Sequence, residues 1–190
     1  SFSIYTFFNP DIIGLVSLQI NNNISKKLIL MSDEERFKDN ENGTLTDTKY
    51  NLTWTKEDSY QMRKKWCSWK GANNYIDWLN EQNFAGFNDW RLPKSQECRN
   101  LYDHECKNTD FDGDIVHLDY QFPEGCGSTY WCQEEQGINA MAYNFYSDRA
   151  YQVRKKAKDE ENMCCRAIRT SGPAVKKSGR LSNTGRSRRE

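Results

Sequence analysis

One stretch constrains the fold more than any other, because it ends one predicted helix, turns and begins a second: Phe84-Ala85-Gly86-Phe87-Asn88-Asp89-Trp90-Arg91-Leu92-Pro93. Gly86 can supply the positive φ of a helix C-cap, and the Asn88-Asp89 pair suits a turn. Pro93 is tolerated in the first turn of a helix but not in its interior. The stretch therefore predicts two helices joined by a tight connection.

We interpret the end of this stretch as a structural motif, which consists of Trp90, Arg91, Leu92 and Pro93. Large aromatic side chains are mostly interior, and a guanidinium beside an indole commonly stacks on it or bonds turn carbonyls. The alternative hypothesis is that Arg91 contacts an anion at the mouth of a pocket.

Apolar periodicity defines the two helices. Ser68 can cap the first, in which apolar residues recur every three or four positions: Trp69, Ala72, Tyr75, Ile76 and Leu79. The second is predicted from Pro93 to Tyr102. Upstream, a short alternating segment ending at Asp47 and the run Leu52–Thr55 predict a hairpin.

The last third of the chain has the pattern of short strands. Four such runs follow one another at close intervals, at 128–132, 140–146, 150–154 and 163–169, and they predict an antiparallel meander. A further short strand is predicted at Ile115–Asp119. Helices and strands together predict an α+β fold.

The chain of 190 residues suits one domain with tails. We expect a weakly packed or disordered leader at 1–36, a domain at 37–169 and a basic disordered tail at 170–190. The apolar run Ile12–Ile20 is too short for a membrane span and lacks the basic residues of a signal peptide. If translation began at Met31, a cytoplasmic location would be expected.

The formal charges balance, with 27 basic and 27 acidic residues, so total charge predicts no nucleic-acid partner. Only the basic tail would give weak, salt-sensitive nucleic-acid contact. No residue set has the spacing of a known catalytic centre, and we therefore expect no enzyme activity and no cofactor. The one alternative is calcium at an acidic loop containing Asp110, Asp112 and Asp114.

Seven cysteines occur without a Cys-x-x-Cys pair, so no metal site is expected and free thiols are the default interpretation. Bridges between Cys98 and Cys106, or between Cys126 and Cys132, are possible in an oxidising compartment. The adjacent Cys164-Cys165 pair should face opposite sides of a strand, one buried and one exposed.

The late hairpins combine aromatic area with cationic donors, and this combination suits an acidic ligand or a protein partner. The candidate ligand contacts are Arg149, Arg154, Lys155, Lys156, Tyr143, Tyr146 and Tyr151. The alternative interpretation is that the tyrosines face inward and the lysines form a solvated turn.

Several short motifs occur in an order that resembles the Lcl C-terminal domain family: Asn42-Gly43-Thr44-Leu45-Thr46-Asp47, Leu52-Thr53-Trp54, Trp90-Arg91-Leu92-Pro93, His117-Leu118-Asp119, Phe122-Pro123, Tyr130-Trp131 and Cys165-Arg166-Ala167-Ile168-Arg169. The resemblance covers residues 37–169. It implies a C-type-lectin-like domain with two helices packed on a short twisted antiparallel sheet. It also implies ligand binding without catalysis, because the family is named for a collagen-like bacterial adhesin that recognises sulfated glycosaminoglycans as a trimer.

The resemblance thus leads us to expect a sulfated or acidic glycan, or a protein partner, with homo-oligomerisation possible. One alternative is a variable ligand-display protein of a diversity-generating retroelement, with residues 128–169 as the varied segment. Another is a thiol oxidase similar to formylglycine-generating enzymes, based on Cys164–Arg169. Those enzymes use cysteines several residues apart, whereas neighbouring cysteines on one strand cannot face one site.

Overall fold

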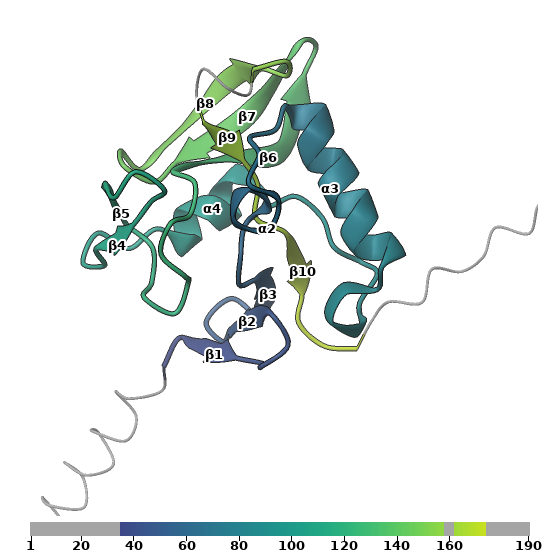
Figure 1. Ribbon diagram of the computed structural model, residues 1–190, viewed down its shortest axis with the longest axis vertical. Coiled ribbons are helices and arrows are strands. Elements are labelled where there is room, and N and C mark those ends of the chain that lie inside the picture. The colour runs from purple at the N-terminus through teal and green to yellow at the C-terminus, as the bar shows by residue number, and fades with distance from the viewer. Residues whose placement is uncertain (1–34, 158–161, 174–190) are drawn as a thin grey trace, which may run out of the picture. The chain divides into compact units, whose positions relative to one another are not determined.

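The computed structural model describes residues 35–157 and 162–173, which are coloured in Figure 1. The leader expected at 1–36 and the tail expected at 170–190 lie mostly outside these residues. The described elements, in chain order, are β1 (Phe37–Asp39), β2 (Thr44–Asp47), β3 (Leu52–Thr55), α2 (Ser59–Arg63), α3 (Trp69–Glu81), the 3-10 helix η1 (Phe84–Gly86), α4 (Ser95–Leu101), β4 (Asn108–Thr109), β5 (Ile115–Val116), β6 (Thr129–Gln136), β7 (Asn139–Asn144), β8 (Arg149–Arg154), β9 (Met163–Cys164) and β10 (Ile168–Thr170).

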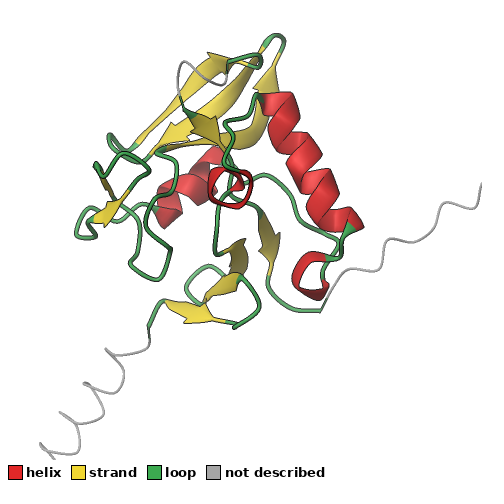
Figure 2. Cartoon of the chain, in the orientation of Figure 1, coloured by secondary structure: helices red, strands yellow, loops and turns green. Residues whose placement is uncertain are grey.

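The described strands form two four-stranded sheets and one two-stranded ribbon, and Figure 2 shows the helical segments in red beside them. One sheet has the order β1-β2-β3-β10, the other has the order β8-β7-β6-β9, and β4 pairs with β5. The predicted hairpin is confirmed, since β2 and β3 pair antiparallel with Leu45 opposite Trp54. The mixed α+β prediction is confirmed, but the single sheet is replaced by several.

The predicted last strand is divided between the two large sheets. Its first part, β9, runs parallel to β6 with Met163 opposite Thr129, so the predicted all-antiparallel meander is wrong at this strand. Its second part, β10, pairs antiparallel with β3, with Ile168 opposite Trp54. The chain crosses between the two sheets at Arg166 and therefore does not continue as one strand. The Arg166 side chain is fully buried and donates hydrogen bonds to backbone carbonyls.

Local signals account for the helix starts. Ser68 caps α3 by accepting from the Gly71 backbone N–H at 3.3 Å, as predicted. The short helix α2 is absent from the sequence predictions, although Asp58 and Gln61 form a complete capping box at its start. Gly86 has the predicted positive φ, +84°, but it does not cap α3: Gln82 is the C-cap of that helix, and Gly86 is the last residue of η1.

The helices α3 and α4 cover opposite faces of the β8-β7-β6-β9 sheet. Alternation along β6 explains this arrangement, because Trp131 packs in one apolar cluster with α3 while Tyr130 and Cys132 pack in another with α4. The sheet is therefore buried on both sides through its centre, and its exposed parts are the hairpin end and the outer strand β8, both visible in Figure 1.

The domain continues beyond the expected boundary at 169. Thr170 pairs with Leu52, and the Ser171 backbone N–H donates to the Asn51 carbonyl at 3.0 Å. None of the helices in the described ranges has both the length and the apolar composition that a membrane crossing requires.

Candidate functional site

The Trp90-Arg91-Leu92-Pro93 motif lies at the junction of α3, α4 and both large sheets. Trp90 is 3% exposed, and its indole N–H donates to the Phe84 carbonyl at 3.1 Å. The Asn80 side chain bonds both the backbone N–H and the carbonyl of Trp90. Pro93 accepts from the Gln133 backbone N–H at 2.7 Å, which ties the start of α4 to β6.

Arg91 of this motif is engaged by the protein itself. Its guanidinium forms a two-pronged ion pair with the Glu97 carboxylate, both N–O distances being 2.7 Å, and Glu97 also accepts from the Lys94 backbone N–H. The backbone of Arg91 bridges to Ile168 of β10. These contacts favour the structural interpretation of Arg91 over the anion-contact hypothesis.

Replacement of Glu97 is expected to change how stability depends on pH. Burial opposes ionisation of Glu97, but bonds from Arg91 and Lys94 outweigh it and hold its pKa below the ordinary value of 4.5. A lowered carboxyl pKa stabilises the fold above the unfolded-state pKa, and this stabilisation disappears as the pH falls through the folded-state value.

We therefore expect Glu97→Gln to lose about 1 to 2 kcal/mol of unfolding free energy at pH 7 and to converge with the wild type as the pH falls through the lowered folded-state pKa of Glu97. Urea denaturation at several pH values measures the difference, and Glu81→Gln at the exposed end of α3 serves as the control. A loss that stays constant down to pH 3 would contradict the ionic role.

The candidate ligand contacts do not all share one surface. Arg149 and Tyr151 of β8 lie opposite Asn144 and Ala142 of β7. The Arg149 and Tyr151 side chains are therefore on the face of the sheet that α3 covers nearer the sheet centre. Arg154 pairs with Asn139 and lies on the other face. Arg149 and Arg154 are at opposite ends of β8, about 16 Å apart along the strand.

Two of the candidate tyrosines are bonded to carboxylates. Tyr143 is fully buried and donates its hydroxyl to Asp148, so it does not belong to a ligand surface. Tyr146 is 40% exposed and donates to Asp110, and partial burial together with this bond raises the pKa of Tyr146 to about 12.

The acidic loop considered for calcium is organised by internal hydrogen bonds. The Asp110 carboxylate accepts from Tyr146 and from the backbone N–H groups of Asp112 and Asp114 at 2.9 and 3.0 Å. Among residues 35–157 and 162–173, no group of three or more His, Cys, Asp or Glu side chains is arranged to hold a metal ion.

Arg154, Lys155 and Lys156 are brought together at the end of the β6-β7 hairpin. With Gly137 and Ile138 they line a shallow depression of about 460 Å³. Ile138 is 73% exposed, the highest fraction among the large exposed hydrophobic side chains of the described residues. The depression therefore combines an apolar side chain with a cluster of cations, which is the composition of a site for an amphipathic anion.

Lys155 is held in place within this cluster. Its ammonium group pairs with Glu135, donates to the Gly137 carbonyl at 2.8 Å and lies 4.8 Å from the centre of a Trp69 ring. Its backbone carbonyl accepts from the Trp69 N–H at the start of α3. Arg154 and Lys156 are exposed, and neither has an ion pair within the described part of the chain.

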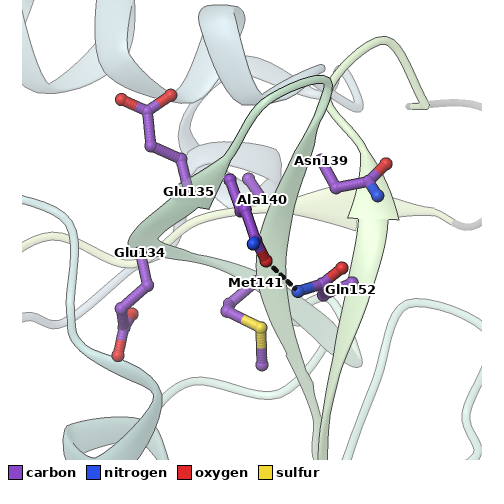
Figure 3. Close-up of a pocket in the computed structure, with 7 residues that line it drawn as sticks. Glu134, Glu135, Asn139, Ala140, Met141 and Gln152 are labelled. Atoms are coloured by element: carbon purple, nitrogen blue, oxygen red, sulfur yellow. Dashed lines mark hydrogen bonds between the residues drawn. The ribbon is translucent and has the colours of Figure 1, made fainter.

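A second, smaller groove of about 220 Å³ lies on the same hairpin and is drawn in Figure 3. A β-bulge between Trp131 and Glu135 interrupts the register of β6 there, and Figure 3 shows the neighbouring Glu134 and Glu135 side chains pointing away from each other. Glu134 accepts from the backbone N–H and hydroxyl of Ser95. The other lining residues are Gln136, Asn139, Ala140, Met141 and Gln152.

The amide groups of this groove were not singled out by sequence reasoning. Gln152 donates to Gln136 at 3.1 Å across the hairpin, the contact dashed in Figure 3. Amides that are scattered along three strands carry no local signal, and the registers of β6 with β7 and of β7 with β8 bring them together. They place neutral hydrogen-bonding groups beside the basic depression.

The adjacent cysteines Cys164, the last residue of β9, and Cys165, which follows it, are both fully buried, so the prediction of one exposed thiol is wrong. They do face opposite sides, because Cys164 packs in the cluster containing α4 residues and Cys165 in the cluster containing α3 residues. Burial raises the pKa of both thiols well above the ordinary value, and neither is therefore poised as a thiolate nucleophile.

A comparison with protein families finds one match. The model of the Lcl C-terminal domain matches residues 43–169, which is more than half of the chain. No curated protein matches the sequence. The matched segment includes the central motif, both large sheets apart from β1, and the hairpin that carries the two depressions.

Proposed function

The chain belongs to the Lcl C-terminal domain family, and on this premise we propose that it is a non-enzymatic binding domain for a sulfated or acidic glycan. The observation that carries the proposal is the cluster of Arg154, Lys155 and Lys156 around the depression at the hairpin end. Guanidinium and ammonium groups bind sulfate and carboxylate oxygens through charge-assisted hydrogen bonds.

In this proposal, the two depressions bind different chemical groups of the glycan. Arg154 and Lys156 bind anionic groups, and Lys155 keeps Glu135 neutralised so that the acidic residue does not repel them. The amides of Gln136, Asn139 and Gln152 bind sugar hydroxyls next to them. A rigid hairpin supported by two layers of helices keeps this surface preorganised.

The same premise leads us to propose a C-type-lectin-like relationship for the domain. Two helices on opposite faces of one sheet, together with a second sheet that contains the first and last described strands, are compatible with it. Self-association through the hairpin surface is a further possibility that sedimentation velocity would detect.

Heparin chromatography tests the glycan proposal. We expect the double variant Arg154→Ala, Lys156→Ala to bind heparin about tenfold more weakly than the wild type. The matched control, Lys38→Ala, Arg149→Ala, removes the same charge from distant exposed positions and should keep wild-type retention. All retention should fall as salt rises, because exposed charges are screened over about 8 Å at physiological ionic strength.

The predicted basic tail needs its own control, because it lies beyond the last described residue, Pro173, and contains several cations. Each protein is therefore also measured as a chain ending at Pro173. If retention disappears with the tail, or if both double variants weaken it equally, the depression is not the glycan site. A protein partner then becomes the better hypothesis.

A further inference from the structure

Two cysteines that are distant in sequence meet in the core between α4 and β6. Cys98 and Cys132 are each fully buried, and their sulfur atoms are 3.9 Å apart, with the Cys132 thiol directed at Cys98. All seven cysteines are reduced in this structure.

We infer that Cys98 and Cys132 form an internal disulfide bond when the chain folds under oxidising conditions. A disulfide requires the sulfur atoms to approach to about 2.05 Å, with the two Cβ atoms about 3.8 Å apart. The sulfur atoms must therefore approach by roughly 2 Å, which requires rotation of the two side chains about χ1.

The backbone holds both partners in register on either side of the contact. The Gln133 N–H donates to the Pro93 carbonyl at 2.7 Å, and the Ser95 N–H donates to the Glu134 carboxylate at 3.0 Å. These bonds join the start of α4 to the part of β6 that immediately follows Cys132. The cysteine pair is thereby kept opposed whether or not the covalent bond is present.

Sequence spacing suggested two other pairs, Cys98 with Cys106 and Cys126 with Cys132. The Cys126 thiol is directed at the Thr109 carbonyl at 3.9 Å. Cys106 is partly exposed, whereas Cys98 faces the core. The competing pair in the structure is Cys67 with Cys165, whose thiols also interact.

The electron acceptor for this oxidation is a small-molecule disulfide, oxidised glutathione. The Cys98 thiolate attacks one glutathione sulfur and releases the other glutathione as a thiolate. The Cys132 thiolate then attacks the Cys98 sulfur and releases the second. Two protons lost by the cysteines are taken up by the two glutathione thiolates, so two thiols are oxidised and one disulfide is reduced.

Burial determines when this exchange occurs. It raises the pKa of the Cys98 thiol well above its ordinary value, and the neighbouring Cys132 raises it further. The folded, reduced protein therefore exchanges slowly, and the bond forms while α4 is still undocked. Once formed, it is shielded from reductants by the same core.

To test this inference, the full chain is refolded from denaturant under two conditions, in a glutathione redox buffer and with excess reductant. Free thiols are then alkylated and the protein is digested with trypsin and chymotrypsin. Chymotrypsin cleaves after Tyr130 and Trp131 and so separates Cys126 from Cys132. We expect a linked peptide pair containing Cys98 and Cys132, with a mass two hydrogen atoms below the sum of the reduced peptides.

Thermal unfolding gives a second readout. The bond closes a loop of about 35 residues and should raise the Tm of the oxidised protein by about 10 °C relative to the reduced protein. Cys98→Ala should abolish this redox-dependent difference, whereas the control Cys106→Ala should retain it. The inference is overturned if Cys98 of the oxidised wild type is alkylated or is linked to any other cysteine. This result does not depend on whether the variants fold.

Discussion

Replacing Asp58 with Ala is expected to lower the free energy of unfolding by about 3 to 5 kcal/mol, because the change leaves a buried guanidinium without its carboxylate. Asp58 and Arg166 both have fully buried side chains, with a closest N–O distance of 3.9 Å. The Asp58 carboxylate also caps α2 and accepts from the Gly127 N–H at 2.7 Å and the Tyr130 hydroxyl at 3.2 Å.

Arg166 stays charged in this position. Burial alone would lower the pKa of its guanidinium, but Tyr130 and Asp58 more than offset burial and raise the pKa above its ordinary value. The guanidinium donates to the carbonyls of Thr55, the last residue of β3, and of Lys56, which follows it. It therefore joins the crossing between β9 and β10 to the other sheet, and the charge cannot be neutralised when Asp58 is removed.

Urea denaturation of a double-mutant cycle measures this coupling. Asp58→Ala and Arg166→Met are each expected to be strongly destabilising, and the double variant should lose clearly less than the sum of the two. The matched control is Asp39→Ala, which removes a carboxylate from a solvent-exposed ion pair with Lys56 and should change stability little. Additive losses in the cycle would show that the pair is not coupled.

Replacing Trp90 with Ala is expected to cost about 3 to 5 kcal/mol, the range typical of a large buried aromatic residue. The indole packs against the rings of Phe84 and Phe87, with ring centres 6.0 and 6.3 Å away. Its removal leaves a cavity under the connection between α3 and α4 and leaves the Phe84 carbonyl without the indole donor.

Trp78 provides the matched control for this prediction. It is 37% exposed on α3, where Arg63 lies 4.8 Å from its ring centre, so the same truncation removes less buried area. We expect Trp78→Ala to lose clearly less unfolding free energy than Trp90→Ala in urea, with a similar m-value. Equal losses at the two positions would contradict the central packing role of Trp90.

Features that depend on residues close together in the chain could be predicted from the sequence. Ser68 starts α3, Gly86 adopts positive φ after it, and the hairpin Thr44–Thr55 pairs as its alternation indicates. Capping, turn formation and hairpin pairing are short-range interactions, so each leaves a readable local pattern. The family membership is also carried by such short motifs, and the cluster Arg154–Lys156 is close together in space because it is consecutive in the chain.

The covered faces of the strands and the contacts between distant residues could not be predicted in this way, because they depend on how separate elements pack. Alternation along β7 does not reveal that α4 buries Tyr143, nor does the spacing of Cys98 and Cys132 reveal their contact. The division of the last strand between two sheets likewise depends on β3 and β6, which are far away in sequence. The two-residue alternation of side chains along a strand assigns residues to the two faces of the sheet. Packing against distant elements determines which of these faces is buried and which remains open to a ligand.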